Sequence, residues 1–387
     1  MFSRLESRLA RQREQNLFRA RREISSRQRP DVVVEGGGRL NFCSNDYLGL
    51  AGHEAVVEAM QRAASRYGAG AGASHLVTGH MTPHHELEEH LAEMTGAPRA
   101  ILFSNGYLAN LGVVTALADR HTRILSDRLN HASLIDAGVL SRARVQRFRH
   151  ADADDAARLL SVGEGDALIV TDSVFSMDGD IAPVAALDDL AARYDASLVV
   201  DDAHGFGVLG DGRGALRHFG LSNRTVVMGT LGKAVGVYGA FVAADAVVVE
   251  ALIQFARPYI YTTALPPAVA AGCLAALELS EHETWRRERL RRHIDRFRRG
   301  ACKAGIPVAA SSTPIQPVLV GTPEAALSIS RELDARGLLV AAIRPPTVPR
   351  QGARLRITLT AAHSDAHVDA LVDALSDVFA GLDVHVE

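Results

Sequence analysis

A lysine that follows one strand, with an acid and a histidine that follow another, forms the most informative group of side chains in this sequence. Lys233 ends the stretch Thr230-Leu-Gly-Lys, just after an apolar run at 225–228. Asp201 and His204 belong to Asp-Asp-Ala-His-Gly, just after the apolar run 197–200. A lysine amine can form a Schiff base with an aldehyde, and a carboxylate can keep a ring nitrogen protonated so that the ring accepts electrons. Together these side chains point to pyridoxal phosphate chemistry, although a lone Gly-Lys turn is more often a solvated surface feature.

Asp201 ends a run of β-branched residues, so we expect its carboxylate to be buried. An isolated buried carboxylate is unfavourable, and a protonated pyridine nitrogen is a suitable cationic partner for it. His204 is placed to hydrogen bond the phenolic oxygen of the same ring. The alternatives are a helix N-cap or surface turn for Asp201 and an ordinary turn histidine for His204.

A phosphate group needs backbone donors at a helix N-terminus. Gly106 and Tyr107 lie between the apolar strand pattern 100–103 and a helical pattern at 106–118, so their amides are candidates. Thr230, three residues before the lysine, can add a hydroxyl. The sequence has no Gly-x-x-x-x-Gly-Lys-[Ser/Thr] loop and no Gly-x-Gly-x-x-Gly that opens a helix, which argues against ATP and NAD as ligands.

His131 begins a helical pattern at 131–141, again directly after a predicted strand. An imidazole in that place can lie flat on a cofactor ring. The alternative is a partly exposed histidine at a helix start, and position alone does not separate the two.

His85 and His90 resemble the histidine pair of a zinc protease, but they are five residues apart rather than four. On a helix this spacing separates the two side chains by about 140°. We therefore expect no metal site.

Strands and helices alternate between about residues 45 and 280. Strand patterns lie at 100–103, 123–126, 145–148, 167–171, 197–200, 225–228 and 239–243, and further helical patterns lie at 53–66, 82–95 and 184–194. This alternation predicts an α/β fold with a mainly parallel sheet flanked by helices. Ligands bind beyond the carboxyl ends of such strands. Asp201, His204, Ser176 and Lys233 all follow predicted strands, so we expect them at one edge of the sheet.

The composition of the chain changes near residue 281, where a strongly charged helical pattern begins. Strand patterns at 315–320, 338–343 and 353–359 and helical patterns at 323–336 and 364–380 follow. They predict a smaller α+β domain. The expected organisation is an N-terminal helix and strand segment (1–44), a large cofactor-binding domain (45–280) and a small C-terminal domain (281–387).

Composition excludes several classes of protein. The formal net charge is −3, which provides no overall field to gather nucleic acid. The apolar run 265–277 is shorter than the ~20 residues of a membrane span. Cys43, Cys273 and Cys302 are far apart and suit free thiols in a cytoplasmic protein. The first thirty residues hold nine arginines, which predicts a basic amphipathic helix; a targeting leader or a nucleic-acid arm is the alternative.

The chain resembles the α-oxoamine synthases, a family of type I pyridoxal-phosphate-dependent enzymes. The stretches Phe-Ser-Met-Asp-Gly-Asp (175–180) and Asp-Asp-Ala-His-Gly (201–205) are specific to that family. Other matching stretches cover nearly the whole chain, at 41–50, 103–110, 230–233, 260–267, 344–349 and 354–360. Those at 260–267 and 344–349 favour the biotin-synthesis member over its glycine-using relatives. The resemblance implies the type I transferase fold.

The resemblance also implies a role for each matching residue. Lys233 would hold the cofactor covalently, Asp201 would face the pyridine nitrogen, His204 would bind the phenolic oxygen and His131 would stack on the ring. The phosphate would be held by Gly106, Tyr107, Thr230 and, from the neighbouring subunit of a homodimer, Thr262. Ser176 would be a further cofactor contact. The amino acid carboxylate would be held by Arg356 with Asn45 nearby, and the acyl substrate by Arg19 and Thr347.

The implied reaction is the decarboxylative condensation of L-alanine with a pimeloyl thioester, whose thiol carrier is coenzyme A or an acyl carrier protein. One departure is Asp172, where the family pattern has glutamate. Three alternatives stay open: a sister synthase with another amino acid or thioester, an aminotransferase that needs no thioester, and a nucleic-acid binder that uses the arginine-rich helix.

Overall fold

The computed structural model describes residues 1–381 and divides them into two compact units. The larger unit contains Leu48–Ser176 and Asp180–Arg287. The other contains Met1–Tyr47, Met177–Gly179 and the chain from Glu288 onward. Whether the ranges expected from the sequence (1–44, 45–280 and 281–387) are separate domains stays a prediction. Within residues 1–381, no helix has both the length and the apolar character needed to cross a membrane.

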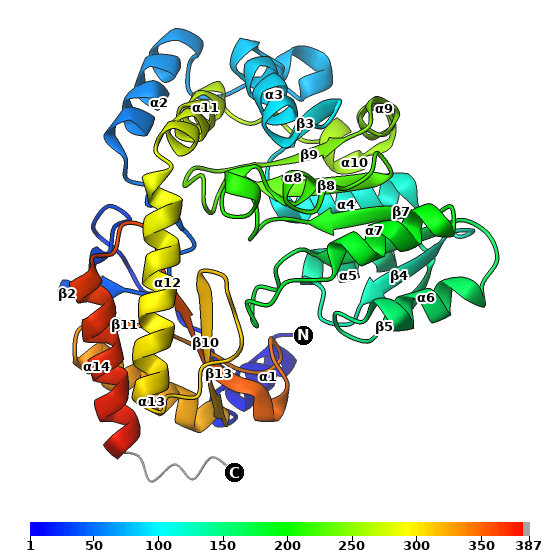
Figure 1. Cartoon of the computed structure of the whole chain (residues 1–387). Coiled ribbons are helices and arrows are strands. Elements are labelled where there is room, and N and C mark those ends of the chain that lie inside the picture. Colours follow the sequence, from blue (N-terminus) through cyan, green and yellow to red (C-terminus); the bar gives the residue numbers. More distant parts are fainter. Residues whose placement is uncertain (382–387) are drawn as a thin grey trace. The chain divides into compact units, whose positions relative to one another are not determined.

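A seven-stranded sheet forms the centre of the larger unit, in the order β3-β9-β8-β7-β6-β4-β5 (Figure 1). Its strands are β3 (Arg99–Phe103), β4 (Arg123–Asp127), β5 (Arg144–Phe148), β6 (Ala167–Asp172), β7 (Ser197–Asp201), β8 (Thr225–Thr230) and β9 (Ala240–Ala244). Four neighbouring pairs are parallel, and only β9 runs against both of its neighbours. The predicted mainly parallel sheet is confirmed, and all seven predicted strands lie within a residue or two of those observed.

Strand β7 shows why both faces of this sheet must be covered. Val199 packs in one apolar cluster, whereas its neighbours Leu198 and Val200 pack in another. Alternate side chains of a strand point to opposite faces, so a continuous apolar strand needs helices on both sides. The Val199 face is covered by α4 (Gly106–Leu117), α5 (Ala132–Leu140), α9 (Ala246–Phe255) and α10 (Arg257–Ile260). The other face is covered by α6 (Ala153–Ser161), α7 (Val184–Arg193) and α8 (Ala215–Phe219).

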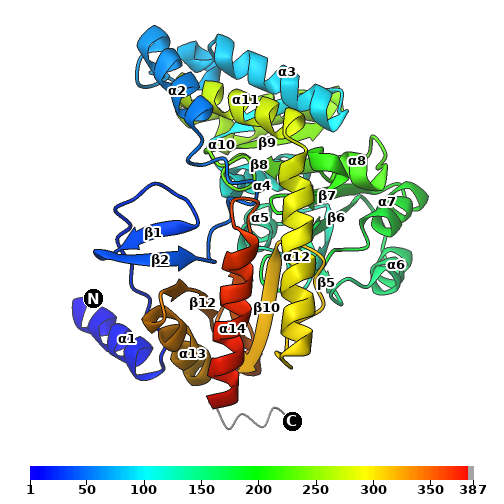
Figure 2. The same cartoon turned by 60° about the vertical axis from the view of Figure 1, so that its left-hand side comes forward.

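Three further helices complete the larger unit at the β3 side of the sheet (Figure 2). They are α2 (Glu54–Tyr67), α3 (Thr82–Thr95) and α11 (Pro267–His282), with a π-helical turn η1 (His75–Gly79) before α3. A short 3₁₀ turn, η2 (Gly210–Gly212), precedes α8.

Two three-stranded sheets form the smaller unit. One has the order β1-β2-β11 and consists of β1 (Asp31–Val34), β2 (Gly37–Asn41) and β11 (Leu338–Leu339). The other has the order β10-β13-β12 and consists of β10 (Ile315–Gly321), β12 (Ala341–Ile343) and β13 (Ala353–Thr358). The remaining elements are α12 (Trp285–Lys303), α13 (Pro323–Ala335), the 3₁₀ turn η3 (Arg350–Gly352) and α14 (Asp365–Gly381).

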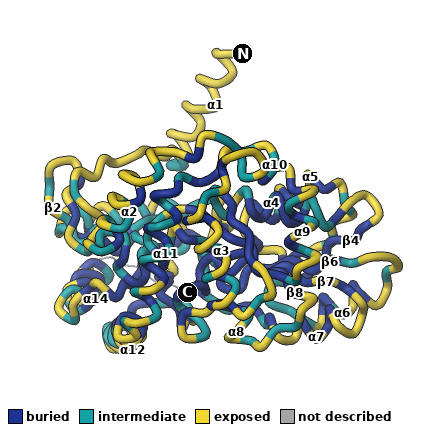
Figure 3. The backbone as a smooth tube through the Cα atoms, turned by 90° about the horizontal axis from the view of Figure 1, so that it is seen from above, coloured by how far each residue is buried: buried dark blue, intermediate teal, exposed yellow. Residues whose placement is uncertain are grey.

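The strand predicted at 338–343 is two strands. Leu338 and Leu339 pair in parallel with β2, whereas Ala341 to Ile343 pair antiparallel with β13. The chain changes sheet at Val340, which a single apolar run cannot reveal. The predicted N-terminal helix is present as α1 (Phe2–Glu14), and it is exposed along its whole length (Figure 3).

Candidate active site

Lys233 lies in a tight loop that joins β8 to β9. Backbone hydrogen bonds close this loop, from Leu231 N–H to Gly239 O and from Gly236 N–H to Lys233 O, both 2.9 Å. Gly236 has φ 77°, and a Cβ there would lie 2.4 Å from the backbone nitrogen of Ala51, so only glycine fits. The Nζ atom of Lys233 lies 2.8 Å from Nε2 of His204. The loop therefore fixes the lysine amine next to the predicted histidine.

Asp201 ends β7 and is 4% exposed. Its Oδ1 accepts the Ala203 N–H at 2.9 Å, and its Oδ2 accepts a hydrogen bond from Asn110 Nδ2 at 2.7 Å. No cationic side chain among residues 1–381 forms an ion pair with this carboxylate. It is stabilised by two donors but keeps its charge available for a cation.

His131 is the N-cap of α5. Its Nδ1 accepts the Ser133 N–H at 3.3 Å and lies 2.7 Å from Ser133 Oγ. Its own N–H donates to Asp172 Oδ2 at 2.8 Å. The edge of the Tyr107 ring faces the imidazole at 6.4 Å between centroids. The histidine side chain is thus held by the start of its own helix.

Asp172, the residue that departs from the family pattern, ends β6 directly beside Asp201 in the sheet. Burial and the neighbouring negative charge of Asp201 raise the pKa of Asp172 well above its usual range. The shorter acid still reaches the backbone of His131.

Helix α4 begins at Gly106, and Asn105 caps it by accepting the Leu108 N–H at 3.0 Å. A Cβ at Gly106 would lie 3.3 Å from the Met228 side chain, so this helix start packs closely against β8. Thr230 donates its hydroxyl to Gly239 O at 3.0 Å. The first amides of α4 therefore suit an anion, whereas the hydroxyl hydrogen of Thr230 is already used within the loop.

A cavity of about 180 Å³ collects these side chains at the carboxyl edge of the sheet. Its lining is Gly106, Tyr107, His131, Asp172, Asp201, Ala203, His204, Met228, Thr230 and Lys233. The structure thus brings together seven residues that the sequence singled out from four separate segments. Ser176 and Thr262 are both half-buried and are not part of this lining within the described residues. Thr262 was expected to act from a neighbouring subunit, which stays a prediction.

The four residues expected to bind substrate form two pairs in the smaller unit. Arg19 Nη2 lies 3.3 Å from Thr347 Oγ1. Arg356, on β13 and 7% exposed, donates to Asn45 Oδ1 at 3.2 Å from both terminal nitrogens. Each pair joins segments about three hundred residues apart that the resemblance assigned to the same substrate group.

Sequence reasoning missed Asn110, Ser133 and Met228, and it noted Asp172 only as a departure. Asn110 follows Gly106 by four residues, so both share one face of α4, and Ser133 lies two residues after His131. These spacings were the available signal. Nothing in the sequence showed that Asn110 and Ser133 lie within hydrogen-bond distance of each other.

The histidines of α3 and η1 provide no ready metal site. His85 and His90 each lie beside a different acid, with Nε2 of His85 3.2 Å from Glu89 and Nε2 of His90 3.1 Å from Glu281. Nitrogen atoms of His75, His80 and His84 lie within 4.8 Å of one another. However, His84 Nδ1 accepts the Met81 N–H and His84 Nε2 contacts Leu265 O at 2.5 Å, so neither ring nitrogen of His84 is available as a ligand.

Comparisons with known proteins show the family to which this chain belongs. The model of the family "Aminotransferase class I and II" matches residues 38–375. A protein of Stutzerimonas stutzeri named 8-amino-7-oxononanoate synthase is 58% identical over 93% of both chains. A serine palmitoyltransferase variant from S. paucimobilis, solved with a bound adduct of pyridoxal phosphate and myriocin, has a TM-score of 0.92 at 28% identity and 98% coverage of both chains. The 8-amino-7-oxononanoate synthase of Francisella tularensis has a TM-score of 0.77 at 30% identity, covering 89% of this chain and 98% of its own.

Proposed function

This chain belongs to the aminotransferase class I and II family and is a pyridoxal-phosphate-dependent enzyme, and from that premise we propose that it joins L-alanine to a pimeloyl thioester. The products are 8-amino-7-oxononanoate, carbon dioxide and the free thiol, in biotin synthesis. The observation that carries the proposal is a single cavity lined by both Lys233 and Asp201 in a chain 58% identical to a protein named for this product.

The residues present fit pyridoxal phosphate. The cavity is lined by an amine, by a buried carboxylate that forms no ion pair with a side chain of residues 1–381, and by a helix N-terminus that suits an anion. These match the aldehyde, the pyridine nitrogen and the phosphate of the cofactor. When bound, the cofactor supplies an electron sink for the negative charge left at Cα of alanine.

In the proposed reaction, Lys233 Nζ removes the Cα proton of alanine and later returns a proton to the product. His204, 2.8 Å from that nitrogen, orients the amine. Asp201 would hold the pyridine nitrogen, and His131 would stack on the ring. The phosphate would be bound by the amides of Gly106 and Tyr107, and by Thr230 once its hydroxyl turns away from Gly239 O, with Ser176 as a further cofactor contact.

In this proposal, each of the two residue pairs of the smaller unit binds one of the two substrates. The guanidinium of Arg356, with Asn45, binds the carboxylate of alanine, because its planar fork matches a carboxylate. Arg19 and Thr347 bind the pimeloyl chain, which also ends in a carboxylate. We further propose a cytoplasmic homodimer in which Thr262 completes the phosphate site of the partner subunit, and either coenzyme A or an acyl carrier protein as the thiol carrier.

The test is Lys233→Ala. We expect turnover to fall by about 10²–10⁴-fold, because the base that transfers the proton is removed. We also expect no cofactor to be trapped covalently by borohydride, with an unchanged melting temperature. Turnover within tenfold of the unmodified enzyme would refute the assignment.

A sister synthase is the second candidate, because the backbone superimposes closely on a serine palmitoyltransferase. Thiol release should be measured with alanine, glycine and serine, each offered with pimeloyl and longer acyl thioesters. A preference for alanine and the pimeloyl thioester supports the proposal. Release of a keto acid without any thioester would instead indicate an aminotransferase.

A further inference from the structure

Behind the cavity, hydrogen bonds connect the side chains of Asp201 and His131. Asn110 Nδ2 lies 2.7 Å from Asp201 Oδ2 and 2.8 Å from Ser133 Oγ. Ser133 Oγ lies 2.7 Å from His131 Nδ1. Asn110 and Ser133 are both fully buried, and neither belongs to the cavity lining. A buried relay thus links the two side chains expected to face the cofactor ring, from α4, α5 and β7.

The backbone fixes the direction of this relay at its His131 end. The Ser133 N–H, 3.3 Å from His131 Nδ1, can only donate, so Nδ1 must accept and carries no proton. The single ring proton is therefore on Nε2, and the imidazole is neutral. The Ser133 hydroxyl donates to the same Nδ1 and accepts from Asn110.

The carboxylate fixes the direction at the other end. Both oxygens of Asp201 receive hydrogen bonds, from the Ala203 N–H and from the amide of Asn110, which suits the ionised form. A flipped Asn110 amide would place its oxygen against the carboxylate, so the nitrogen must lie there. Oδ1 of Asn110 is buried and has no partner among residues 1–381. An unpaired buried oxygen is unfavourable. The two hydrogen bonds from the N–H groups of Asn110 therefore explain why an amide side chain occupies this position.

We propose that Asn110 and Ser133 are positioning residues that tie the ionised form of Asp201 to the neutral, Nε2-protonated form of His131. Asn110 and Ser133 thereby fix both the charge of the carboxylate that would face the ring nitrogen and the proton position of the imidazole that would stack on the ring. This inference rests on the proposed function in one respect, which is that the cavity would hold pyridoxal phosphate.

Lys233, His204 and Asp201 line the same cavity as His131, and three further ionisable side chains lie near it. Asp172 accepts the backbone N–H of His131, and the Tyr107 ring faces it edge-on. The Tyr107 hydroxyl is hydrogen-bonded to Asp136, on α5. None of these three side chains forms a hydrogen bond with the imidazole, so the Ser133 bond can be changed separately from them.

Ser133→Ala removes the hydroxyl but keeps the backbone donor. The neutral imidazole loses one hydrogen bond, so protonation of the ring becomes easier. We expect the acidic limb of the pH profile of kcat/KM to move upward by roughly half to one pH unit. Ser133→Thr, which keeps a hydroxyl, should restore the profile. Ser141→Ala is the matched control, because Ser141 is a buried serine at the end of the same helix whose hydroxyl bonds Gly138 O.

Asn110→Leu replaces the amide by an apolar side chain of similar size. The Asp201 carboxylate loses the donor that orients it, so we expect the affinity of the apoprotein for pyridoxal phosphate to fall about tenfold. Fluorescence titration measures this without any turnover. If Asn110→Leu does not fold, Asn110→Ser takes its place, because serine is too short to bridge Asp201 and Ser133.

The relay is overturned if Ser133→Ala and the folded Asn110 variant both match Ser141→Ala in pH profile and cofactor affinity. Failure of the proposed function is a different result, in which the unmodified protein itself binds no pyridoxal phosphate or produces no thiol.

Discussion

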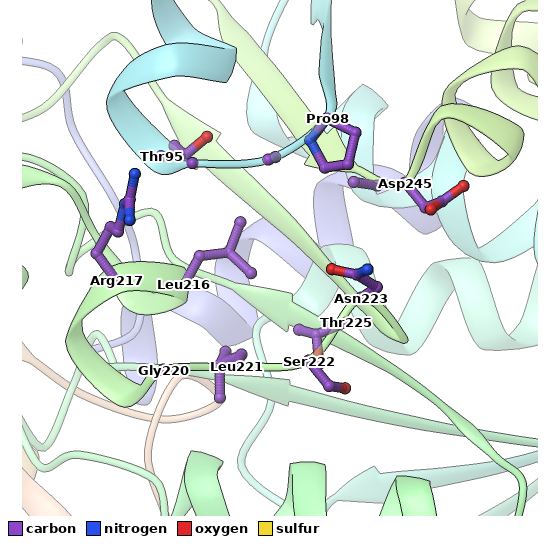
Figure 4. Close-up of a pocket in the computed structure, with 13 residues that line it drawn as sticks. Thr95, Pro98, Leu216, Arg217, Gly220, Leu221, Ser222, Asn223, Thr225 and Asp245 are labelled. Atoms are coloured by element: carbon purple, nitrogen blue, oxygen red, sulfur yellow. The ribbon is translucent and has the colours of Figure 1, made fainter.

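Two cavities lie at opposite edges of the same seven-stranded sheet, and among residues 1–381 the larger one is lined by neither a lysine nor a histidine. The cavity at the carboxyl ends of β6, β7 and β8 has a volume of about 180 Å³ and contains Lys233 and Asp201. The other, about 300 Å³, lies where β8 begins and β9 ends, with Arg217 and Asp245 on opposite sides (Figure 4).

The difference between the cavities lies in how their polar groups are already bonded. At the larger cavity, Ser222 and Thr225 donate to Asp188 at 2.8 and 2.5 Å, and Thr95 donates to Leu91 O at 2.7 Å. Asp245 caps α9 by accepting the Val247 N–H. At the smaller cavity, the Asp201 carboxylate accepts two hydrogen bonds but forms no ion pair with a side chain of residues 1–381. We therefore expect the active site at this buried carboxylate rather than at the larger cavity.

The largest effect is expected at Asp201. Asp201→Ala removes the anion opposite the cofactor nitrogen, and we expect kcat/KM to fall by at least about 100-fold. Melting temperature should also fall, because the Ala203 N–H and the Asn110 amide lose their acceptor. Steady-state kinetics and thermal denaturation test both points, and a loss below threefold would end the distinction between the cavities.

Beside the larger cavity, Asp188→Ala should affect stability rather than catalysis. It leaves the Ser222 N–H and the hydroxyls of Ser222 and Thr225 without their acceptor. We expect the free energy of unfolding to fall by about 1–3 kcal/mol, with kcat unchanged. Urea denaturation measures this, and exposed Asp189 on the same helix supplies the control Asp189→Ala. A large loss of kcat in folded Asp188→Ala would contradict the comparison.

His150 sharpens the comparison, because it follows the carboxyl end of β5 but has both ring nitrogens bonded. It contacts Asp127 at 3.1 Å and Asp180 at 2.8 Å. Burial alone lowers the pKa of His150, but the bonds with Asp127 and Asp180 outweigh burial and raise it to about 10. A raised folded-state pKa stabilises the fold fully below the unfolded value, about 6.5, and the effect disappears as pH rises toward 10.

The measurement is the difference in unfolding free energy between the unmodified protein and His150→Gln across that pH range. We expect this difference to shrink steadily between about pH 6.5 and 10. A difference that stays constant or grows would show that the histidine is not held as a cation by the two acids.

The smallest effect is expected for Arg217→Ala. Arg217 is exposed, and its guanidinium lies over Gly96 at the end of α3. Surface substitutions of this kind usually change stability by no more than about 0.5 kcal/mol. We expect turnover within twofold of the unmodified enzyme and unchanged Michaelis constants. A specific loss of substrate affinity would mean that the larger cavity binds a ligand after all.

The elements that position the site were predictable because their signals are local. Continuous apolar runs of four to six residues gave β6, β7 and β8, and a 3.6-residue pattern gave α7 between β6 and β7, whereas α6 and α8 were not among the predicted helices. The carboxyl ends of parallel strands share one edge, so Asp201 and Lys233 could be placed together from the order of strands and helices alone. The division of 338–343 between two sheets was not predictable, because pairing partners far away in the chain decide it.

The sequence by itself determined the α/β alternation, the glycine loop that presents Lys233 and the chemistry that a lysine, an acid and a histidine can perform. Only the tertiary structure decided that Asn110 lies between Asp201 and Ser133 and that Arg356 meets Asn45. The physical reason is that hydrogen bonds act over about 3 Å between specific atoms, whereas sequence patterns report only which face of an element is buried. The charge states of Asp201 and His131 therefore depend on contacts that no single segment contains.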